Sequence, residues 1–218
     1  MACSLTSMTV ADVTLRRDVS GCHPYAEDMP RWESGARERL QQAALPLFQE
    51  RGYDGVTVAE IAAAAGLTER TFFRHFTDKR EVLFQGQDQL ERSFLDGAAE
   101  ASGDDAMSLA RAALDRAAGF FPDDRRPWAR ARQTVIDANP ALQERELLKL
   151  SALAAALTRA LAARGIDPVT AALAAESTVT VFRTAFTAWI AEEEPRPFAE
   201  VQAAVLTGLH ALLAPGRA

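Results

Sequence analysis

The sequence predicts an all-α protein of about nine helices, with a three-helix N-terminal domain and a larger C-terminal helical domain. Three observations lead to this fold class. Apolar residues recur at helical spacing from residue 34 almost to the C-terminal end. Alanine, the strongest helix former, is abundant. No alternating apolar pattern of useful length predicts a strand.

The composition of the 218-residue chain argues against several classes of protein. Its 48% hydrophobic and 25% charged residues are ordinary for a soluble globular protein. The net charge of −6 argues against a protein that coats nucleic acid non-specifically, but it leaves room for a local basic surface. No apolar run approaches the roughly 20 residues that span a bilayer, and the N-terminal region lacks the apolar segment of a secretory signal. We therefore expect a cytoplasmic protein without a membrane partner.

Chemistry that needs clustered ligands or known catalytic motifs is also not expected. Cys3 and Cys22 both lie near the N-terminus, so they build neither a disulfide framework nor a four-ligand zinc site. None of His23, His75 and His210 has a glutamate three positions earlier, which is the spacing of helical metal sites. The sequence contains no P-loop, dinucleotide-binding or serine-elbow motif. We expect no enzyme, no catalytic residue, no metal and no cofactor.

The first part of the chain divides into a tail and a helix. Residues 1–33 show no sustained period and predict a mobile tail. A helical period begins at Ser34, which is a suitable N-cap. The period continues to Gly52, which is suited to the left-handed residue that ends a helix. The N-terminal domain is expected over residues 34–80.

Two short helices follow in this domain. Thr57 and Glu60 have the spacing of a capping box at the start of the first. A turn at Gly66 separates it from the second, which is predicted over 69–76. A short helix, a glycine turn and another short helix form the helix-turn-helix pattern.

A second possible capping box stands where the C-terminal domain, residues 81–218, is expected to begin. Asp78 and Glu81 predict the start of one long helix that continues through Leu90 to Phe94. The rest of the chain reads as helix after helix, separated by glycine and proline.

Four segments stand at fixed mutual spacing within residues 37–84: Phe48-Gln49-Glu50-Arg51-Gly52-Tyr53, Thr57-Val58-Ala59-Glu60-Ile61-Ala62, Ala65-Gly66-Leu67-Thr68-Glu69-Arg70-Thr71-Phe72-Phe73-Arg74-His75-Phe76 and Asp78-Lys79. Together they strongly resemble the DNA-binding domain of the tetracycline-repressor (TetR) family. Asn139-Pro140-Ala141-Leu142 and Val181-Phe182-Arg183 resemble an actinobacterial branch of that family that includes regulators of the mycofactocin type. The resemblance implies a C-terminal domain that binds a small effector and forms a dimer.

The second short helix carries the candidate base-reading residues. A recognition helix offers its N-terminal side chains to base edges in the major groove, and here these are Thr68, Glu69, Arg70, Thr71 and Phe73. Arg70 is suited to bidentate contact with guanine. Glu69 has two equal interpretations, as an acceptor from cytosine or as a first-turn acid that complements the helix dipole.

Other residues are candidates for phosphate contacts. Arg74, His75 and Lys79 lie where donors would meet the DNA backbone, and Thr57 caps a helix whose N-terminal amides can face a phosphate. Phe73 stands where the family pattern usually has tyrosine, so a phenolic phosphate contact is lost. From charge alone, a solvated and salt-bridged face is the alternative; the spacing of the motifs favours DNA.

The C-terminal region contains aromatic residues interleaved with a few charges. The candidate ligand-binding residues are Trp128, Arg132, Glu176, Arg183 and Phe186. An ordinary helical core is the alternative for each. Arg132 and Arg183 are the stronger candidates, because a buried arginine needs an anion. That anion is either Glu176 or an acidic group of the ligand, and the sequence leaves both open.

The helices expected over 168–190 and 198–213 are the candidates for a dimer interface, because the last has apolar residues around much of its circumference. A symmetric dimer pairs two recognition helices and requires a palindromic site on double-stranded DNA. The sequence thus predicts a transcriptional repressor that binds a palindromic operator as a homodimer and is released by a lipophilic or acidic small molecule. The alternative is a helical small-molecule-binding protein without a DNA role.

Overall fold

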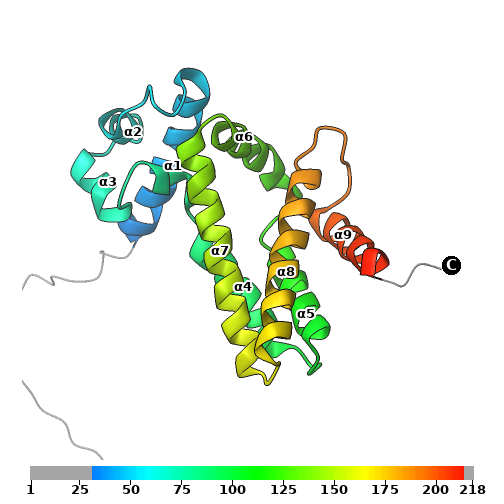
Figure 1. The fold of residues 1–218 in the computed structure, drawn as a ribbon. Coiled ribbons are helices and arrows are strands. Elements are labelled where there is room, and N and C mark those ends of the chain that lie inside the picture. The colour runs from blue at the N-terminus through cyan, green and yellow to red at the C-terminus, as the bar shows by residue number, and fades with distance from the viewer. Residues whose placement is uncertain (1–30, 214–218) are drawn as a thin grey trace, which may run out of the picture.

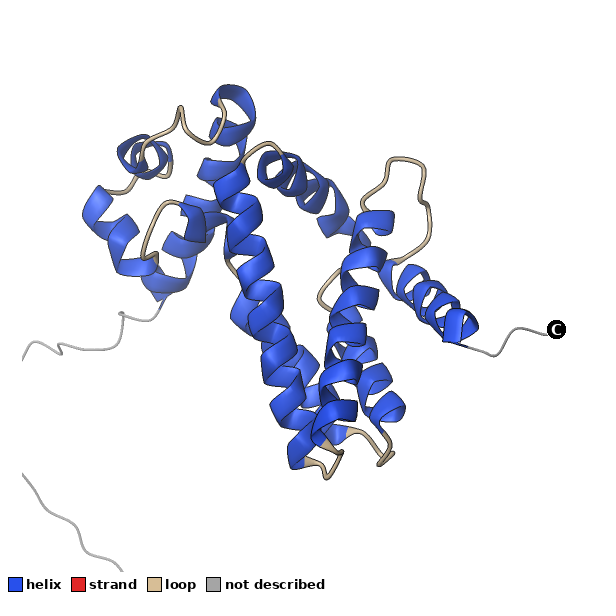
Figure 2. Ribbon diagram, viewed as in Figure 1, coloured by secondary structure: helices blue, strands red, loops and turns tan. Residues whose placement is uncertain are grey.

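The computed structural model describes residues 31–213, with side chains for residues 35–212. Within this part of the chain it has nine α-helices, two 3-10 turns and no strand, which confirms the all-α fold (Figure 2). The first three helices form a head at one end of the molecule. The long helix α7 (Pro140–Ala163) runs from beside the head to the opposite end (Figure 1).

The head consists of α1 (Arg31–Arg51), α2 (Val58–Ala64) and α3 (Glu69–His75). Both halves of the predicted capping box are present at Thr57 and Glu60. The turn between α2 and α3 passes through Gly66, whose φ of 67° lies in the left-handed region that favours glycine. The head is filled by fully or almost fully buried side chains: Leu40, Phe48, Ile61 and Phe72.

The start of α1 differs from the prediction. The helix begins at Arg31, so Ser34 lies inside it and is not its N-cap. Residues 31–33 extend the helix because none of them is a glycine or proline that would oppose helical backbone. The tail expected over 1–33 otherwise falls on residues 1–30, which lie outside the described residues.

The prediction that one long helix starts at Asp78 is also wrong. The chain forms a 3-10 turn, η1 (Arg80–Phe84), and α4 begins only at Gln87 and ends at Glu100. Gly86 stands between them with a φ of 85°, which interrupts a helical path. Asp78 does accept the backbone N–H groups of residues 80 and 81, but the Glu81 side chain points to α7 and not back to the cap.

The remaining elements build the larger core. They are α5 (Ala106–Ala118), η2 (Asp123–Arg125), α6 (Arg126–Asp137), α7, α8 (Pro168–Trp189) and α9 (Phe198–Leu213). Asn139 caps α7 and Asp167 caps α8, each with a proline in the first turn. The core is centred on buried aromatic residues, among them Phe94, Phe182 and Trp189. No helix in the described part of the chain is both long enough and apolar enough to cross a membrane.

The head and the core share buried side chains. Val135 and Ile136 of α6 and Leu142 of α7 belong to the same apolar cluster as the head residues. The Asn139 side chain, besides capping α7, donates to Asp54 of the head at 3.2 Å. The first turn of α7 and the last turn of α6 therefore pack against the head.

Candidate nucleic-acid interface and ligand cavity

Helix α3 is positioned by a cap at its start and an aromatic anchor on its inner face. Thr68 Oγ1 accepts the Thr71 backbone N–H at 3.2 Å and lies 3.0 Å from the Thr71 hydroxyl. Phe72 is completely buried, with its ring centroid 5.2 Å from that of Phe76. Because Phe72 faces inward, the outer face of α3 presents Glu69, Arg70, Phe73 and Arg74 to solvent.

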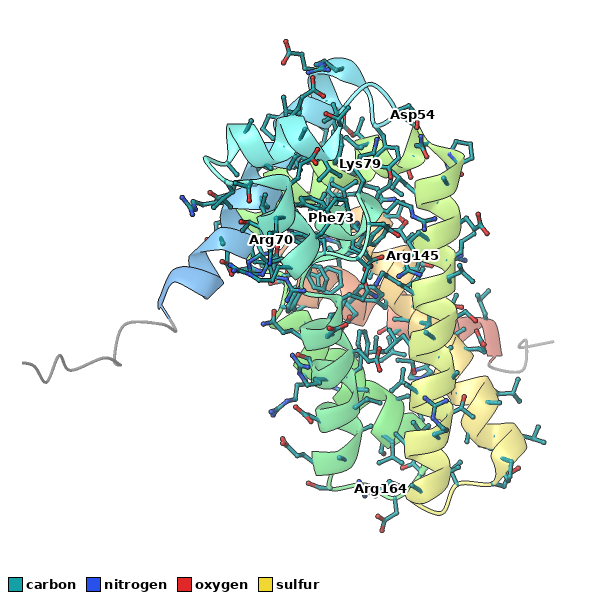
Figure 3. The ribbon with its side chains drawn as sticks, turned by 90° about the vertical axis from the view of Figure 1, so that its left-hand side faces the viewer. Asp54, Arg70, Phe73, Lys79, Arg145 and Arg164 are labelled. Carbon is teal, nitrogen blue, oxygen red and sulfur yellow. The ribbon has the colours of Figure 1, made fainter. Side chains whose placement is uncertain are left out.

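The outer face of α3 combines two cations with an exposed ring. Neither Arg70 nor Arg74 has a hydrogen-bond or ion-pair partner among residues 31–213. Phe73 is 56% exposed, a high value for a large apolar side chain. Figure 3, which looks at this side of the molecule, labels Arg70 and Phe73 on the head. The geometry does not support the alternative of a salt-bridged face at these two arginines.

Lys79 lies in a different environment from the α3 arginines. Its ammonium group donates to the backbone carbonyls of Tyr53 and Val56, both at 2.8 Å, and sits 4.1 Å from the centre of the Tyr53 ring. Burial lowers the pKa of Lys79 and raises that of Tyr53 to about 12. Lys79 therefore closes the loop between α1 and α2, which leaves at most one ammonium hydrogen for a phosphate.

Two further candidates lie in the head: Thr57 is the N-cap of α2, and His75 is the last residue of α3. The backbone N–H and hydroxyl of Thr57 both donate to Glu60, each at 2.8 Å, and Arg51 donates to the same carboxylate. These contacts, led by the backbone bond from Thr57, lower the pKa of Glu60 to about 2. His75 is half-buried, and its carbonyl accepts from Arg37 at 3.2 Å.

A cavity lies at the junction of η1, α4, α6, α7 and α8, with an empty volume, open solvent included, of about 860 Å³. Four of the five predicted ligand residues, Trp128, Arg132, Arg183 and Phe186, line it. Glu176 does not line it and is exposed on α8. The aromatic part of the wall consists of Phe84, Phe120, Phe121, Trp128, Phe182 and Phe186.

Of the two arginines expected to be buried, only Arg132 is largely withdrawn from solvent. Its side chain is 12% exposed, whereas Arg183 is exposed at the cavity. The carboxylate partner of Arg132 is Glu146, at 3.2 Å, and not Glu176. Burial lowers the pKa of Arg132, and the charge of Glu146 opposes that shift. Nothing in the sequence pairs residues 132 and 146, because their contact depends on how α6 and α7 pack.

Arg125 is a cavity residue that the sequence reasoning missed. Its guanidinium lies 4.4 Å from the centre of the Phe120 ring and 5.8 Å from that of Trp128. It donates to the Phe120 carbonyl at 3.1 Å but forms no ion pair with any described residue. Burial lowers the pKa of Arg125. Its proximity in sequence to Phe120, Phe121 and Trp128 was a usable signal.

Comparisons with known proteins agree with this arrangement. Residues 40–85 match the model of the bacterial regulatory proteins of the tetR family. The HTH-type transcriptional regulator TcmR of Streptomyces glaucescens is 42% identical over 59 residues, which is 27% of this chain and 26% of TcmR. The HTH-type transcriptional repressor KstR2 of Rhodococcus jostii is 38% identical over 73 residues, 34% of this chain and 33% of KstR2. The match thus spans only about a quarter to a third of each relative.

The likeness extends further in the fold than in the sequence. The solved structure of the transcriptional regulator FadR from Bacillus subtilis, in complex with stearoyl-CoA, has a TM-score of 0.51 at 20% identity. The superposition covers 79% of this chain and 96% of the FadR chain, so the two share their fold. Residues 40–85 thus carry the similarity to the bacterial regulatory proteins of the tetR family, and the all-helical fold is shared with FadR.

Proposed function

We propose that this chain is a transcriptional repressor that binds a palindromic operator as a homodimer and is released when a lipophilic, acidic small molecule occupies the cavity. The observation that carries the proposal is the outer face of α3. Arg70 and Arg74 have no protein partner among the described residues, and Thr68 fixes the start of the helix beneath them. Such a helix end can present an arginine to base edges.

Apolar side chains on α8 and α9 support the homodimer. Val169, Leu173 and Leu212 are 69%, 65% and 83% exposed. Large apolar side chains exposed on adjacent helices are typical of a partner surface. A twofold dimer would then set two α3 helices about one DNA turn apart, roughly 34–36 Å.

The composition of the cavity wall supports an acidic, lipophilic effector. Six aromatic residues supply apolar surface, and three arginines stand against one glutamate among the charged lining residues. An apolar pocket with a few convergent polar groups is the usual form of a small-molecule site. FadR, a fold neighbour, was solved with stearoyl-CoA, a molecule that has both an acyl chain and phosphates.

The test is selection of random duplex DNA on the purified full chain, with Arg70→Ala and Arg74→Met in parallel. We expect a palindrome for the native chain. Arg70→Ala should relax selectivity at one base pair of each half-site, and Arg74→Met should weaken binding to all sequences by a similar factor. Sedimentation of the protein–DNA complex should give two chains per duplex.

A bound effector can hold the protein in its released state, so the selection is repeated after unfolding and refolding to remove ligand. No enrichment at moderate salt from either preparation would contradict the proposal. It would favour the alternative, a helical small-molecule-binding protein without a DNA role.

A further inference from the structure

The segment 84–87, which joins the last residue of η1 to the first residue of α4, lines two cavities. The first is the aromatic cavity described above, and the second is lined also by Arg37, His75 and Lys149. The segment contains Gly86 in the left-handed region, and the side-chain oxygen of Gln85 is buried without a hydrogen-bond partner in the described structure. Gln85 and Gly86 border empty space in both cavities, so this part of the backbone can move without disrupting a close-packed core, whereas the Phe84 side chain is buried in the head cluster.

Two sets of polar contacts hold the 3-10 turn η1, which leads into this segment. On one side, Glu81 pairs with Arg145 at 2.7 Å and with Lys149 at 3.2 Å, both on α7. On the other, Arg132 of α6 donates through Nε to the carbonyl of Leu83 at 2.7 Å. Only the second of these is made by a residue of the aromatic cavity, because neither Glu81 nor Arg145 lines it.

The donors of Arg132 are used unequally. Nη1 faces Glu146 at 3.2 Å, Nε faces Leu83, and no hydrogen bond within the described residues uses Nη2. Nε and Nη2 form one edge of the planar guanidinium, and a carboxylate binds such an edge through two parallel hydrogen bonds. A ligand carboxylate on that edge would take Nε from the Leu83 carbonyl and leave Nη1 with Glu146.

We propose that Arg132 is the positioning residue that couples the cavity to the head: an anionic group of the ligand replaces the Leu83 carbonyl on the Nε–Nη2 edge and thereby frees η1 and the segment 84–87. This inference rests on the proposed function for its effect on DNA. Loss of the hydrogen bond from Arg132 to the Leu83 carbonyl changes how the head packs against α6. By reciprocity, operator binding must weaken binding of the anion by the same factor.

The experiment uses dodecanoate as the probe and dodecan-1-ol as its uncharged match. Binding is followed by the change in tryptophan fluorescence, because Trp128 lines the cavity. Operator affinity is measured with and without saturating probe. We expect dodecanoate to weaken operator binding by about tenfold or more. Dodecan-1-ol should occupy the cavity with an effect below about twofold, because it presents no anion to Arg132.

Two variants separate coupling from simple binding. Arg132→Lys keeps a cation but loses the planar fork, so it should still bind dodecanoate while the effect on operator affinity falls to less than about twofold. Arg183→Met removes a cavity cation that forms no hydrogen bond or ion pair with η1 in the described structure. It should bind dodecanoate more weakly, and at saturation the native effect on operator affinity should remain.

A readout without DNA distinguishes failure of this inference from failure of the proposed function. Dodecanoate should speed amide hydrogen exchange at residues 83–87 in the native chain and not in Arg132→Lys. If no operator exists but this response is found, the coupling stands and the DNA role does not. Absence of dodecanoate binding, equal effects of dodecanoate and dodecan-1-ol on operator affinity, or full coupling in Arg132→Lys would overturn the inference.

Discussion

The arginines of the head and those of the core differ in what their guanidinium groups contact. Arg70 and Arg74 on α3 face solvent without a partner in the described structure. Arg130 donates to the carbonyls of residues 190 and 191 at the end of α8, and Arg164 donates to the carbonyls of residues 98 and 99 in the last turn of α4. Carbonyls at helix C-termini lack a partner in their own helix. Arginines that supply that partner stabilise the fold, whereas the α3 arginines keep their donors available.

The largest effect on stability is expected for substitution of Arg164, which lies at the end of α7 far from the head (Figure 3). Its guanidinium makes hydrogen bonds to four carbonyls between residues 98 and 103 and to the Asp104 carboxylate. Arg164→Met should lower the free energy of unfolding by about 2–3 kcal/mol, measured by urea denaturation. Arg159 lies on α7, is exposed and forms no hydrogen bond or ion pair among residues 31–213. Arg159→Met should therefore change the free energy of unfolding by less than about 0.5 kcal/mol. Equal losses of unfolding free energy in Arg164→Met and Arg159→Met would show that the carbonyl contacts of Arg164 do not stabilise the fold.

Lys79 should behave like a core cation although it belongs to the head. Lys79→Met leaves two carbonyls without their donor, so unfolding should become easier by about 2 kcal/mol. Operator binding should weaken for all sequences at the same time. The matched variant is Arg74→Met, which should weaken operator binding without changing the thermal melt. An unchanged melt in Lys79→Met would place this residue with the α3 arginines instead.

Arg70 should show the opposite pattern. Arg70→Ala should reduce discrimination between the operator and a single-base variant by about 1–2 kcal/mol, because a bidentate base contact is lost. Competition titration at one salt concentration measures this difference. Stability should stay within about 0.5 kcal/mol of the native chain. Arg92→Ala, an exposed arginine on α4, is the control and should leave discrimination intact; unchanged discrimination in Arg70→Ala would remove this residue from the reading surface.

The smallest effect is expected from an exposed carboxylate of the head. The pKa of Glu60 is about 2, below its ordinary 4.5, so its contribution to stability is complete above pH 4.5 and is lost as the pH falls through 2. The difference in melting temperature between the native chain and Glu60→Gln should therefore be largest near neutral pH and shrink with acidification. Glu50→Gln, which removes an exposed charge without a cap, serves as the reference. A difference that grows at low pH would contradict the assignment.

Features of the fold that depend on neighbouring residues were predictable from the sequence. The caps at Thr57, Thr68 and Asp167 involve residues within three positions, so their pattern is visible in a linear chain. The helix-turn-helix follows from the same local signals. In the site, the prediction of Trp128 and Arg132 as lining residues agrees with the cavity, because aromatic residues and arginines cluster on α6 and α8.

Features that depend on distant residues were not predictable. Glu81 looked like part of a capping box, but its partner Arg145 is 64 positions away. The Glu146 partner of Arg132 likewise depends on how α6 and α7 pack. The break at Gly86, by contrast, had a local signal, because glycine favours the left-handed region. The role of each site residue in binding DNA or ligand stays a prediction, as does the resemblance to an actinobacterial branch.

The two lysines of the chain stand at two different structural junctions. Lys79 closes the loop between α1 and α2, and Lys149, 17% exposed, pairs with Glu81 where η1 meets α7. An amine engaged in such contacts reacts slowly with acylating reagents until the local structure opens. Peptide mapping after brief acylation would therefore report opening of the head and of the η1–α7 junction as two separate rates. Because the chain has only these two lysines, acylation reports local opening at two defined sites.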